Sequence, residues 1–280
     1  MEQEPYKTKC QALMNQITAL TSQDIAVAFS GGVDSSLLLK IACEKAKTAG
    51  TRVYAITIHT MLHPVGELEL TKKVAEETGA IHRIIKVDEL KEAGIAKNPV
   101  DRCYLCKRYM FKRLLKEADQ LQVKTAIEGT NEDDTRAYRP GIAALRELGI
   151  KSPLLEAGFT KADVRRLAGE LNISVANRPS APCLATRFPY DTVLSYEEMK
   201  KVDEIEVYLR NQGFYNVRAR IHGELVRLEV DAADIPLLVQ QRTELAERIK
   251  RLGYSYVTAD LEGFRSGSQD IHVVREKQNE

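Results

Sequence analysis

The sequence lacks an apolar run long enough to cross a membrane, and it lacks an excess of charge of either sign. Its 41 lysines and arginines nearly balance its 40 aspartates and glutamates over 280 residues, so no general field attracts nucleic acid or a membrane surface. The start, Met1 to Pro5, is unlike a secretory signal peptide. These absences argue against membrane-spanning and secreted classes and predict a cytoplasmic protein with one large or two modest domains.

Cysteine is scarce and odd in number. Five cysteines in an otherwise ordinary composition argue against a secreted framework of disulfides. The sequence also lacks the Gly-Lys-Ser/Thr ending of a Walker A loop and the G-x-G-x-x-G of a dinucleotide-binding fold. We therefore expect the cysteines to be reduced, metal-bound or catalytic, and any nucleotide site to be of another kind.

The stretch from Ile25 to Ser36 (IAVAFSGGVDSS) predicts a site for a polyphosphate. Its five leading apolar residues predict a strand buried on both faces of a parallel sheet. Gly31 and Gly32 allow a tight turn that points several N–H groups at an anion, and the helix that follows adds its partial positive charge. Asp34 is suited to hold the Mg²⁺ that accompanies a polyphosphate. The alternative is a plain strand–turn–helix junction in which Ser or Asp caps the helix.

The motif Ser-Gly-Gly-Val-Asp-Ser resembles the pyrophosphate loop of the PP-loop ATP pyrophosphatase superfamily. The resemblance implies cleavage of ATP between the α and β phosphates, transfer of AMP to a substrate oxygen, and attack of a nucleophile on the activated carbon. His59 is added to the ATP site because it ends the next predicted strand, where open α/β sheets bind ligands. The residues assigned to ATP are Ser30, Gly31, Gly32, Val33, Asp34, Ser35 and His59.

The alternation of strands and helices predicts an α/β fold with a doubly wound parallel sheet, followed by a smaller α+β domain. In the first part, strands are predicted at 25–29, 53–58, 81–87 and 125–128, and helices at 6–20, 65–78, 101–115 and 160–171. In the second part, helices are predicted at 195–213 and 232–251, and strands at 216–221, 225–230 and 254–259. A polar loop at 129–135 contains Asn131 and Asp133, which with Arg139 are candidate ATP contacts. The predicted boundaries are 1–180 for the ATP-binding domain, 181–270 for the substrate and oligomerisation domain, and 271–280 for a polar tail.

Three of the cysteines are candidate functional residues. Cys103 and Cys106 share one face of a predicted helix. Three roles fit this placement: thiolate ligands, a redox pair, or small core residues like Cys10 and Cys43. Flanking cations, at Arg102, Lys107 and Arg108, favour thiolates. Cys183 lies in an irregular, proline-containing segment at the predicted domain boundary, where ligand sites concentrate. Three cysteines do not complete a four-sulfur zinc site, but they can ligate three irons of a [4Fe–4S] cluster.

Four segments together resemble the LarE family of ATP-dependent sacrificial sulfur transferases: Ser30–Ser35, Pro99–Lys107, Ser180–Tyr190 and Gly263–Gly267. The resemblance covers nearly the whole chain, and the segments around Cys183 and Arg265 are more specific than the loop. It implies adenylation of a pyridinium-3,5-biscarboxylic acid mononucleotide and conversion of its carboxylates to thiocarboxylates. This is a step in the synthesis of the nickel-pincer nucleotide cofactor of lactate racemase.

The family has two sulfur chemistries. In one-cysteine members, the residue matching Cys183 gives up its own sulfur. In three-cysteine members, the positions matching Cys103, Cys106 and Cys183 hold a [4Fe–4S] cluster whose extra sulfide is the donor. This chain has all three, so the resemblance implies the cluster chemistry, with ATP and Mg²⁺ as the other cofactors. One difference is Asp191, where the family usually has glycine after Pro-Tyr.

The alternating stretch Val217 to His222 predicts a strand with Arg218, Arg220 and His222 on one face. From the residues alone, an ordinary solvated strand face is favoured. The resemblance implies instead that Arg218, Arg220 and Arg265 bind the substrate phosphate through bidentate contacts. Arg187 is a further anion-binding candidate. Glu206 and Glu229 match family positions that can bind a metal, with surface carboxylates as the alternative.

The expected partners are a small nucleotide substrate, further copies of the chain in a homo-oligomer, and a protein that restores the donor sulfide, with no nucleic acid and no membrane. Three other functions fit parts of the pattern. A PP-loop thiolase of tRNA would need a basic surface for RNA. An ammonia-using, amide-forming synthetase would leave the cysteines structural. A nucleotide-binding regulator without chemistry would release no pyrophosphate.

Overall fold

The computed structural model describes residues 3–136, 140–179, 182–265 and 267–268, and the chain forms two compact units. The first unit comprises Met1–Thr60, Val65–Ala93 and Cys103–Ser180, and the second comprises Met61–Pro64, Gly94–Arg102 and Ala181–Glu280. Two short segments of the first 180 residues thus group with the second unit. The predicted tail at 271–280 lies outside the described residues, as does Arg139.

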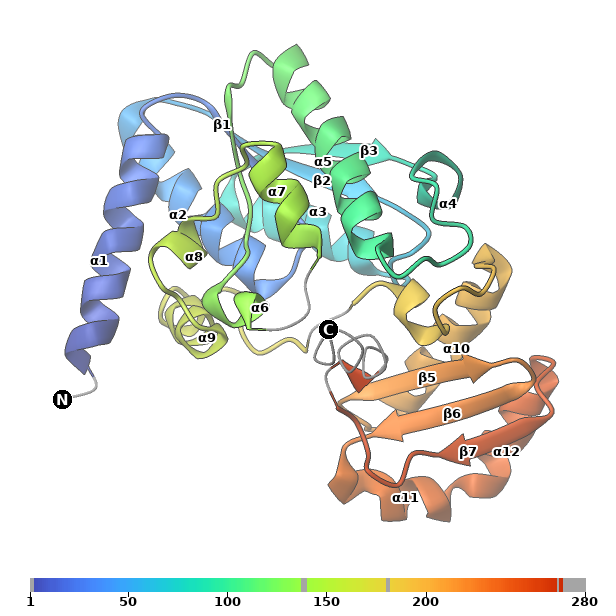
Figure 1. Ribbon diagram of the computed structural model, residues 1–280. Coiled ribbons are helices and arrows are strands. Elements are labelled where there is room, and N and C mark those ends of the chain that lie inside the picture. The colour runs from blue at the N-terminus through green and yellow to red at the C-terminus, as the bar shows by residue number, and fades with distance from the viewer. Residues whose placement is uncertain (1–2, 137–139, 180–181, 266, 269–280) are drawn as a thin grey trace, which may run out of the picture. The chain divides into compact units, whose positions relative to one another are not determined.

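The first unit contains a parallel four-stranded sheet in the order β3-β2-β1-β4 (Figure 1). Its strands are β1 (Ile25–Ala28), β2 (Val53–His59), β3 (Ile81–Lys86) and β4 (Thr125–Ile127). All four lie where the sequence predicted them, and the predicted fold class is confirmed. Because β1 lies between β2 and β4, the loop that follows β1 is flanked by the carboxyl ends of two neighbouring strands.

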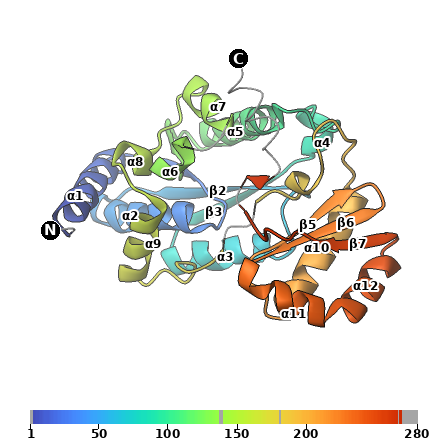
Figure 2. The same cartoon turned by 60° about the horizontal axis from the view of Figure 1, so that its bottom comes forward.

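Helices cover both faces of this sheet, as Figure 2 shows. Alternate strand residues face opposite ways. Ile25 and Val27 pack among residues of α1 (Gln3–Leu20), α2 (Val33–Ala49), α3 (Glu67–Thr78) and α9 (Lys161–Glu170). Ala26, with Tyr54 and Ile56 of β2, packs among residues of α5 (Arg102–Gln120) and α7 (Gly141–Glu147). Strands buried on both faces explain the continuous apolar runs of the sequence.

Several short helices were not expected. The predicted polar loop at 129–135 contains α6 (Glu132–Thr135), because Asn131 and Asp134 form a capping box. The other short helices of this unit are α4 (Glu89–Glu92) and α8 (Pro153–Glu156). Each is a single turn, and α8 buries Pro153 and Leu154.

The second unit contains a three-stranded sheet in the order β5-β6-β7. The strands are β5 (Val217–His222), β6 (Leu225–Val230) and β7 (Tyr256–Ala259). β5 and β6 are antiparallel, whereas β6 and β7 are parallel. The register pairs Ala219 with Leu228 on the apolar face and Arg218 with Glu229 on the other, so the predicted alternation holds. The unit also contains the 3-10 turn η1 (Leu184–Arg187) and α10 (Tyr196–Asn211).

The single helix predicted at 232–251 is wrong. The segment forms three pieces, η2 (Ala232–Asp234), α11 (Ile235–Gln240) and α12 (Arg242–Arg251). Pro236, in the first turn of α11, favours a new helix start there. At Gln241 the backbone (φ −87°, ψ 7°) leaves the α-helical region, which separates α11 from α12. Among all described residues, no helix is both long and apolar enough to cross a lipid bilayer.

Candidate active site

The glycine loop leads into α2 without a side-chain cap on that helix. Gly32 is the N-cap of α2, and among the described residues no side chain caps this helix, so the capping alternative is wrong. Gly31 has a φ of 76°, a left-handed conformation that favours glycine. Ser35 is buried: its Oγ accepts from the backbone N of Ser30 (3.3 Å) and donates to the carbonyl of Gly32 (3.2 Å). The Ser35 hydroxyl therefore links the two sides of the turn, and the first N–H groups of α2 have no side-chain cap.

Asp34, in the first turn of α2, is held from two other parts of the first unit. Its Oδ1 accepts a hydrogen bond from Asn131 Nδ2 (3.0 Å), and its Oδ2 forms an ion pair with Lys161. Asn131 Oδ1 also accepts from the backbone N of Asp133 (3.0 Å), so the amide is fixed at both ends. The polar residues predicted beside the loop thus meet Asp34. Their direct contact with ATP stays a prediction.

Gly129, just after β4, is placed against the start of α2. A β-carbon at this position would lie 3.0 Å from Asp34 Cβ and 3.0 Å from the backbone N of Ser35. We expect Gly129→Ala to displace the loop and to weaken ATP binding about tenfold to a hundredfold, because small displacements in such sites have effects of this size. Equilibrium binding of ATP measures the effect. As a control, Gly169→Ala in α9, where a β-carbon meets no atom within 4 Å, should bind ATP normally; unchanged affinity in Gly129→Ala would contradict the steric argument.

The end of β2 carries His59 and Thr60. The carbonyl of His59 accepts a hydrogen bond from the backbone N of Val87 (3.1 Å), which ties the ends of β2 and β3 together. Glu89 begins α4 beyond β3 and is only 1% exposed. Burial raises the pKa of Glu89, and the nearby Thr60 side chain partly offsets this. A role of His59 in ATP binding stays a prediction.

The raised pKa of Glu89 predicts a pH-dependent stability. The folded state keeps this proton to a higher pH than the unfolded chain does. Its stabilising contribution is therefore complete below the ordinary value of 4.5 and is lost as the pH rises through the raised pKa. Glu89→Gln should unfold at higher denaturant concentration than the wild type at neutral pH, and the gain should shrink in acid. The exposed substitution Glu76→Gln should show no such gain; equal behaviour of the two variants would refute the prediction.

Cys103 and Cys106 lie one turn apart on α5, and both thiols are reduced and half-buried. The flanking cations have other partners. Arg108 Nε donates to Glu147 Oε1 (2.9 Å), and the buried Arg102 bonds to Asn98 in the second unit. Within either unit, the described residues bring no three Cys, His, Asp or Glu side chains together as a metal site. Cys103 and Cys106 belong to the first unit and Cys183 to the second, and a cluster held by the three cysteines stays a prediction.

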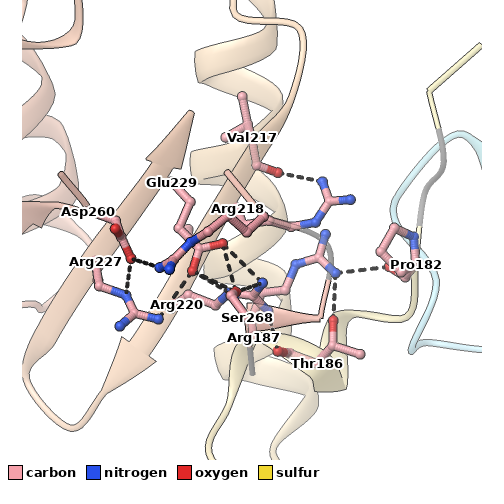
Figure 3. Close-up of polar contacts among 12 residues, drawn as sticks. Pro182, Thr186, Arg187, Val217, Arg218, Arg220, Arg227, Glu229, Asp260 and Ser268 are labelled. Carbon is pink, nitrogen blue, oxygen red and sulfur yellow. Dashed lines mark hydrogen bonds and ion pairs between the residues drawn. The ribbon is translucent and has the colours of Figure 1, made fainter. Parts of the chain in front are cut away.

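Cys183 is the N-cap residue of η1 in the second unit, and Arg187 fixes its backbone. Arg187 is 1% exposed, and its Nη1 donates to the carbonyls of Pro182 and Cys183 (3.1 Å each) and to Thr186 Oγ1 (2.8 Å) (Figure 3). Its Nε and Nη2 bind the two carboxylate oxygens of Glu206 at 2.8 Å each. Burial alone would lower the pKa of Arg187, but the Glu206 carboxylate raises it above its ordinary value. The cation is thus permanent and holds the turn that bears the thiol.

The two arginines on the polar face of β5 are buried rather than solvated, whereas His222 at the end of the strand is exposed. Arg220 binds both oxygens of Glu229 through Nε (3.1 Å) and Nη2 (3.0 Å), and its Nη1 donates to the carbonyl of Thr186 (2.6 Å) (Figure 3). Glu206 and Glu229 are both 0% exposed, so the surface-carboxylate alternative is wrong. Ser268 Oγ and Arg227 Nη2 also donate to Glu229. These carboxylates hold arginines in place, and metal binding by them stays a prediction.

Arg218 and Arg265 complete the basic face. The guanidinium of Arg218 lies 4.9 Å from the ring centre of Phe264, and its Nη1 donates to the carbonyl of Val217 (2.6 Å). Burial, with help from Arg187 and Arg220, lowers its pKa to about 10. It therefore stays charged at neutral pH in surroundings that favour a bound anion. Arg265 pairs with Asp260 and Glu262 after a turn in which Gly263 has a φ of 72°.

Comparison with known proteins identifies the family. The PP-loop domain family matches residues 3–135, and this supports ATP binding by the first unit. The pyridinium-3,5-bisthiocarboxylic acid mononucleotide synthase of Lactiplantibacillus plantarum is 36% identical over 253 residues, which cover 90% of this chain and 91% of that protein. The chain belongs to the LarE family.

Other relatives extend the comparison. An uncharacterized protein of Synechocystis sp. is 37% identical over 86% of this chain and 90% of its own length. A probable sulfurtransferase of Methanocaldococcus jannaschii is 26% identical over 84% of this chain and 77% of its own length. The LarE family similarity thus covers both units.

The structure explains the difference at Asp191. Its φ is 61°, in the left-handed region that glycine adopts most easily and that Asp and Asn tolerate better than other residues. The backbone N of Asp191 donates to the carbonyl of Asn98 (3.0 Å), and Asn98 Nδ2 donates to the carbonyls of Phe188 and Pro189. The segment after Cys183 thus keeps a glycine-like turn without glycine.

Sequence reasoning missed four residues that shape these sites: Gly129, Lys161, Asn98 and Arg227. Gly129 had a usable signal, because glycine at the carboxyl end of a buried strand often marks a close approach of the backbone. Lys161 had none, since 127 positions separate it from Asp34 and no spacing rule links them. Asn98 and Arg227 act through tertiary contacts that only the folded chain shows.

Proposed function

We propose that the protein is an ATP-dependent sulfur transferase that converts the carboxylates of pyridinium-3,5-biscarboxylic acid mononucleotide into thiocarboxylates. The observation that carries the proposal is the similarity to the Lactiplantibacillus plantarum synthase over 90% of this chain. The uncapped PP-loop on the first unit and the reduced thiol of Cys183 on the second supply the two halves of the chemistry.

In the first half-reaction, a substrate carboxylate oxygen attacks the α-phosphorus of ATP. A bond forms between this oxygen and phosphorus, the bond to the α–β bridging oxygen breaks, and pyrophosphate leaves with the electron pair. The loop N–H groups and Ser30 are suited to hold the phosphates. Asp34 would hold Mg²⁺, and its carboxylate, already turned toward an ammonium and an amide, fits a hard cation. When bound, the metal neutralises charge on the phosphates.

In the second half-reaction, sulfur replaces AMP at the acyl carbon, and the phosphate oxygen of AMP takes the electron pair. Thiolate sulfur is the ligand that iron–sulfur clusters require, and Cys103, Cys106 and Cys183 are all reduced. We propose that these three would hold a [4Fe–4S] cluster, which when bound would supply sulfide at an open iron. Arg187 keeps the backbone around Cys183 in one conformation.

Substrate recognition is proposed at the basic face of the second unit. Arg218 and Arg265 would bind the substrate phosphate, and the lowered pKa of Arg218 supports this because a bound dianion would offset the burial of its charge. Arg187 and Arg220, also candidates for the phosphate from the sequence, already have internal partners for their donors. We therefore assign Arg187 to positioning the Cys183 turn and Arg220 to positioning the turn at Thr186. A homo-oligomer and a sulfide-donating protein remain predictions.

The test is turnover of purified protein, prepared without oxygen, with ATP, Mg²⁺ and the biscarboxylate mononucleotide. We expect AMP, pyrophosphate and a thiocarboxylate product by mass spectrometry. An amide product in the presence of ammonia would instead indicate the amide-forming synthetase. Salt-sensitive binding and thiolation of tRNA would indicate the tRNA thiolase. Pyrophosphate release in none of these reactions would leave only a nucleotide-binding regulator.

A further inference from the structure

The peptide group that leads into the glycine loop is held at both ends. It joins Phe29 to Ser30, so its carbonyl belongs to Phe29 and its N–H belongs to Ser30. The N–H donates to Ser35 Oγ (3.3 Å), inside the loop. The carbonyl accepts from the hydroxyl of Thr57 (2.8 Å), a buried residue of β2. Because a peptide group is planar, these two hydrogen bonds together fix the direction in which the chain enters the loop.

The Thr57 hydroxyl has a second neighbour, His82 of β3. His82 Nε2 lies 2.8 Å from Thr57 Oγ1. The two side chains share one face of the sheet, because Thr57 pairs with Ile84, two positions along β3 from His82. The His82 ring also packs edge-on against the ring of Phe29, with the ring centres 6.0 Å apart and the planes at 75°. His82 thus contacts both residues that form the hydrogen bond to the loop peptide.

The number of hydrogens determines the role of each group. A hydroxyl carries one hydrogen and a carbonyl can only accept, so the hydrogen of Thr57 is donated to Phe29. The oxygen of Thr57 then accepts from His82, which requires a hydrogen on Nε2. Burial lowers the pKa of His82, and the charge of Lys72 lowers it further. The ring is therefore neutral at pH 7, and the tautomer that fits is the one with its hydrogen on Nε2.

We propose that His82 is a positioning residue of the nucleotide site: through Thr57 it holds the peptide between Phe29 and Ser30, and with it the glycine loop, in the orientation that binds pyrophosphate. The hydrogen bond from His82 turns the Thr57 hydrogen toward the carbonyl. Phe29 is 2% exposed, so its carbonyl would be left buried and unsatisfied if the hydroxyl rotated away. The inference rests on the proposed function for ATP as the ligand of the loop, but it does not depend on the substrate or on the source of sulfur.

The first experiment measures the binding of magnesium pyrophosphate by calorimetry, because this ligand reports on the loop without the nucleoside. We expect Thr57→Val, which keeps the side-chain shape and removes the hydroxyl, to weaken binding about tenfold, the effect of losing one buried hydrogen bond. Thr57→Ser keeps the hydroxyl and should retain most of the affinity. Thr51→Val is the matched control. The Thr51 hydroxyl donates to the carbonyl of Thr21 (2.7 Å) at the opposite end of β1 and β2, so this variant should bind normally.

The second experiment isolates the contribution of His82. His82→Phe keeps a ring against Phe29 but removes the Nε2 hydrogen, and it should weaken pyrophosphate binding about threefold, because Thr57 still has a hydrogen to donate. Added to Thr57→Val, it should cause no further loss, since the two residues act through one hydrogen-bonded chain. In the wild-type protein, nitrogen NMR of the imidazole should place the His82 hydrogen on Nε2.

Three results would overturn the proposal: normal pyrophosphate binding by Thr57→Val, independent losses that add in the double variant, or a His82 hydrogen on Nδ1 at neutral pH. If Thr57→Val does not fold, unchanged binding by His82→Phe is the refuting result in its place. Because pyrophosphate binding needs no mononucleotide, absence of a thiocarboxylate product leaves these results standing. Wild-type protein that binds no magnesium pyrophosphate would instead overturn the proposed function as well.

Discussion

Replacing Cys183 with alanine should abolish thiocarboxylate formation while ATP is still cleaved to pyrophosphate. The change removes the sulfur from the second half-reaction and leaves the PP-loop, in the other unit, untouched. Loss of the reacting group in an enzyme lowers the rate by about a thousandfold or more. Arg187 and Thr186 bond to the backbone carbonyl of Cys183, which alanine retains, so the turn should keep its conformation. Product mass and pyrophosphate release, measured on the same sample, separate the two steps.

The other two cysteines decide between the two sulfur chemistries. If the three thiols hold a cluster, Cys103→Ser and Cys106→Ser should lose bound iron, the brown colour and sulfur transfer together. If Cys183 gives up its own sulfur, both serine variants should remain active, and the wild-type protein should lose the mass of H₂S after one turnover. Cys43→Ser is a control, because Cys43 packs against the core of the first unit and burial raises its pKa to about 11. Full sulfur transfer by Cys183→Ala would refute both chemistries.

Replacing Glu206 with glutamine should destabilise the second unit by about 3–5 kcal/mol, the usual result of leaving one partner of a buried ion pair without its counter-charge. Glu206 is fully buried and accepts from Arg187 and from the backbone N of Ala219 (3.1 Å). Burial would raise the pKa of Glu206, but the charge of Arg187 lowers it below the ordinary value of 4.5. The stability from this pair is therefore complete above 4.5 and is lost as the pH falls through the depressed pKa.

Two comparisons make this prediction sharp. Glu204→Gln, on the same helix but at a half-exposed ion pair with Arg248, should change stability by less than about 1 kcal/mol. The double variant Arg187→Met with Glu206→Met should be less destabilised than Glu206→Gln, because it does not leave the buried charge of Arg187 without its counter-charge. Denaturant unfolding at neutral and acid pH measures all three. A small effect of Glu206→Gln, or a double variant as unstable as the single one, would contradict the role given to this pair.

The first sheet and the loop were predictable because local sequence determines them. The run from Ile25 to Phe29 suits burial on both faces, and two glycines before Asp34 permit the left-handed backbone of a tight turn, as Gly31 shows. The α/β alternation then follows from the order of the strands. The break at Gln241 was not predictable, because Gln241 and its neighbours have no helix-breaking residue apart from Pro236, which is itself compatible with a first helical turn.

The charge pairing of the second unit was also beyond the sequence. Alternation placed Arg218 and Arg220 on one face but could not say what covers that face. Arg220 is bound by Glu229 across the sheet and by the turn at Thr186, and Arg218 lies against Phe264, contacts that join separate parts of the chain. The same holds for Lys161 and Asp34. The periodicity of a sequence predicts which face of a strand a side chain occupies, whereas the tertiary fold determines which residue it contacts.

Thr186 makes two hydrogen bonds that fix the spacing between two parts of the second unit. Its hydroxyl bonds to the carbonyl of Cys183, and its own carbonyl accepts from Arg220. The thiol-bearing turn and the basic strand are thus parts of one rigid frame. Under the proposed function, this frame acts as a molecular ruler: a nucleotide reaches the sulfur only if the span from its phosphate to its carboxyl carbon matches, so shorter or longer homologues should bind without reacting.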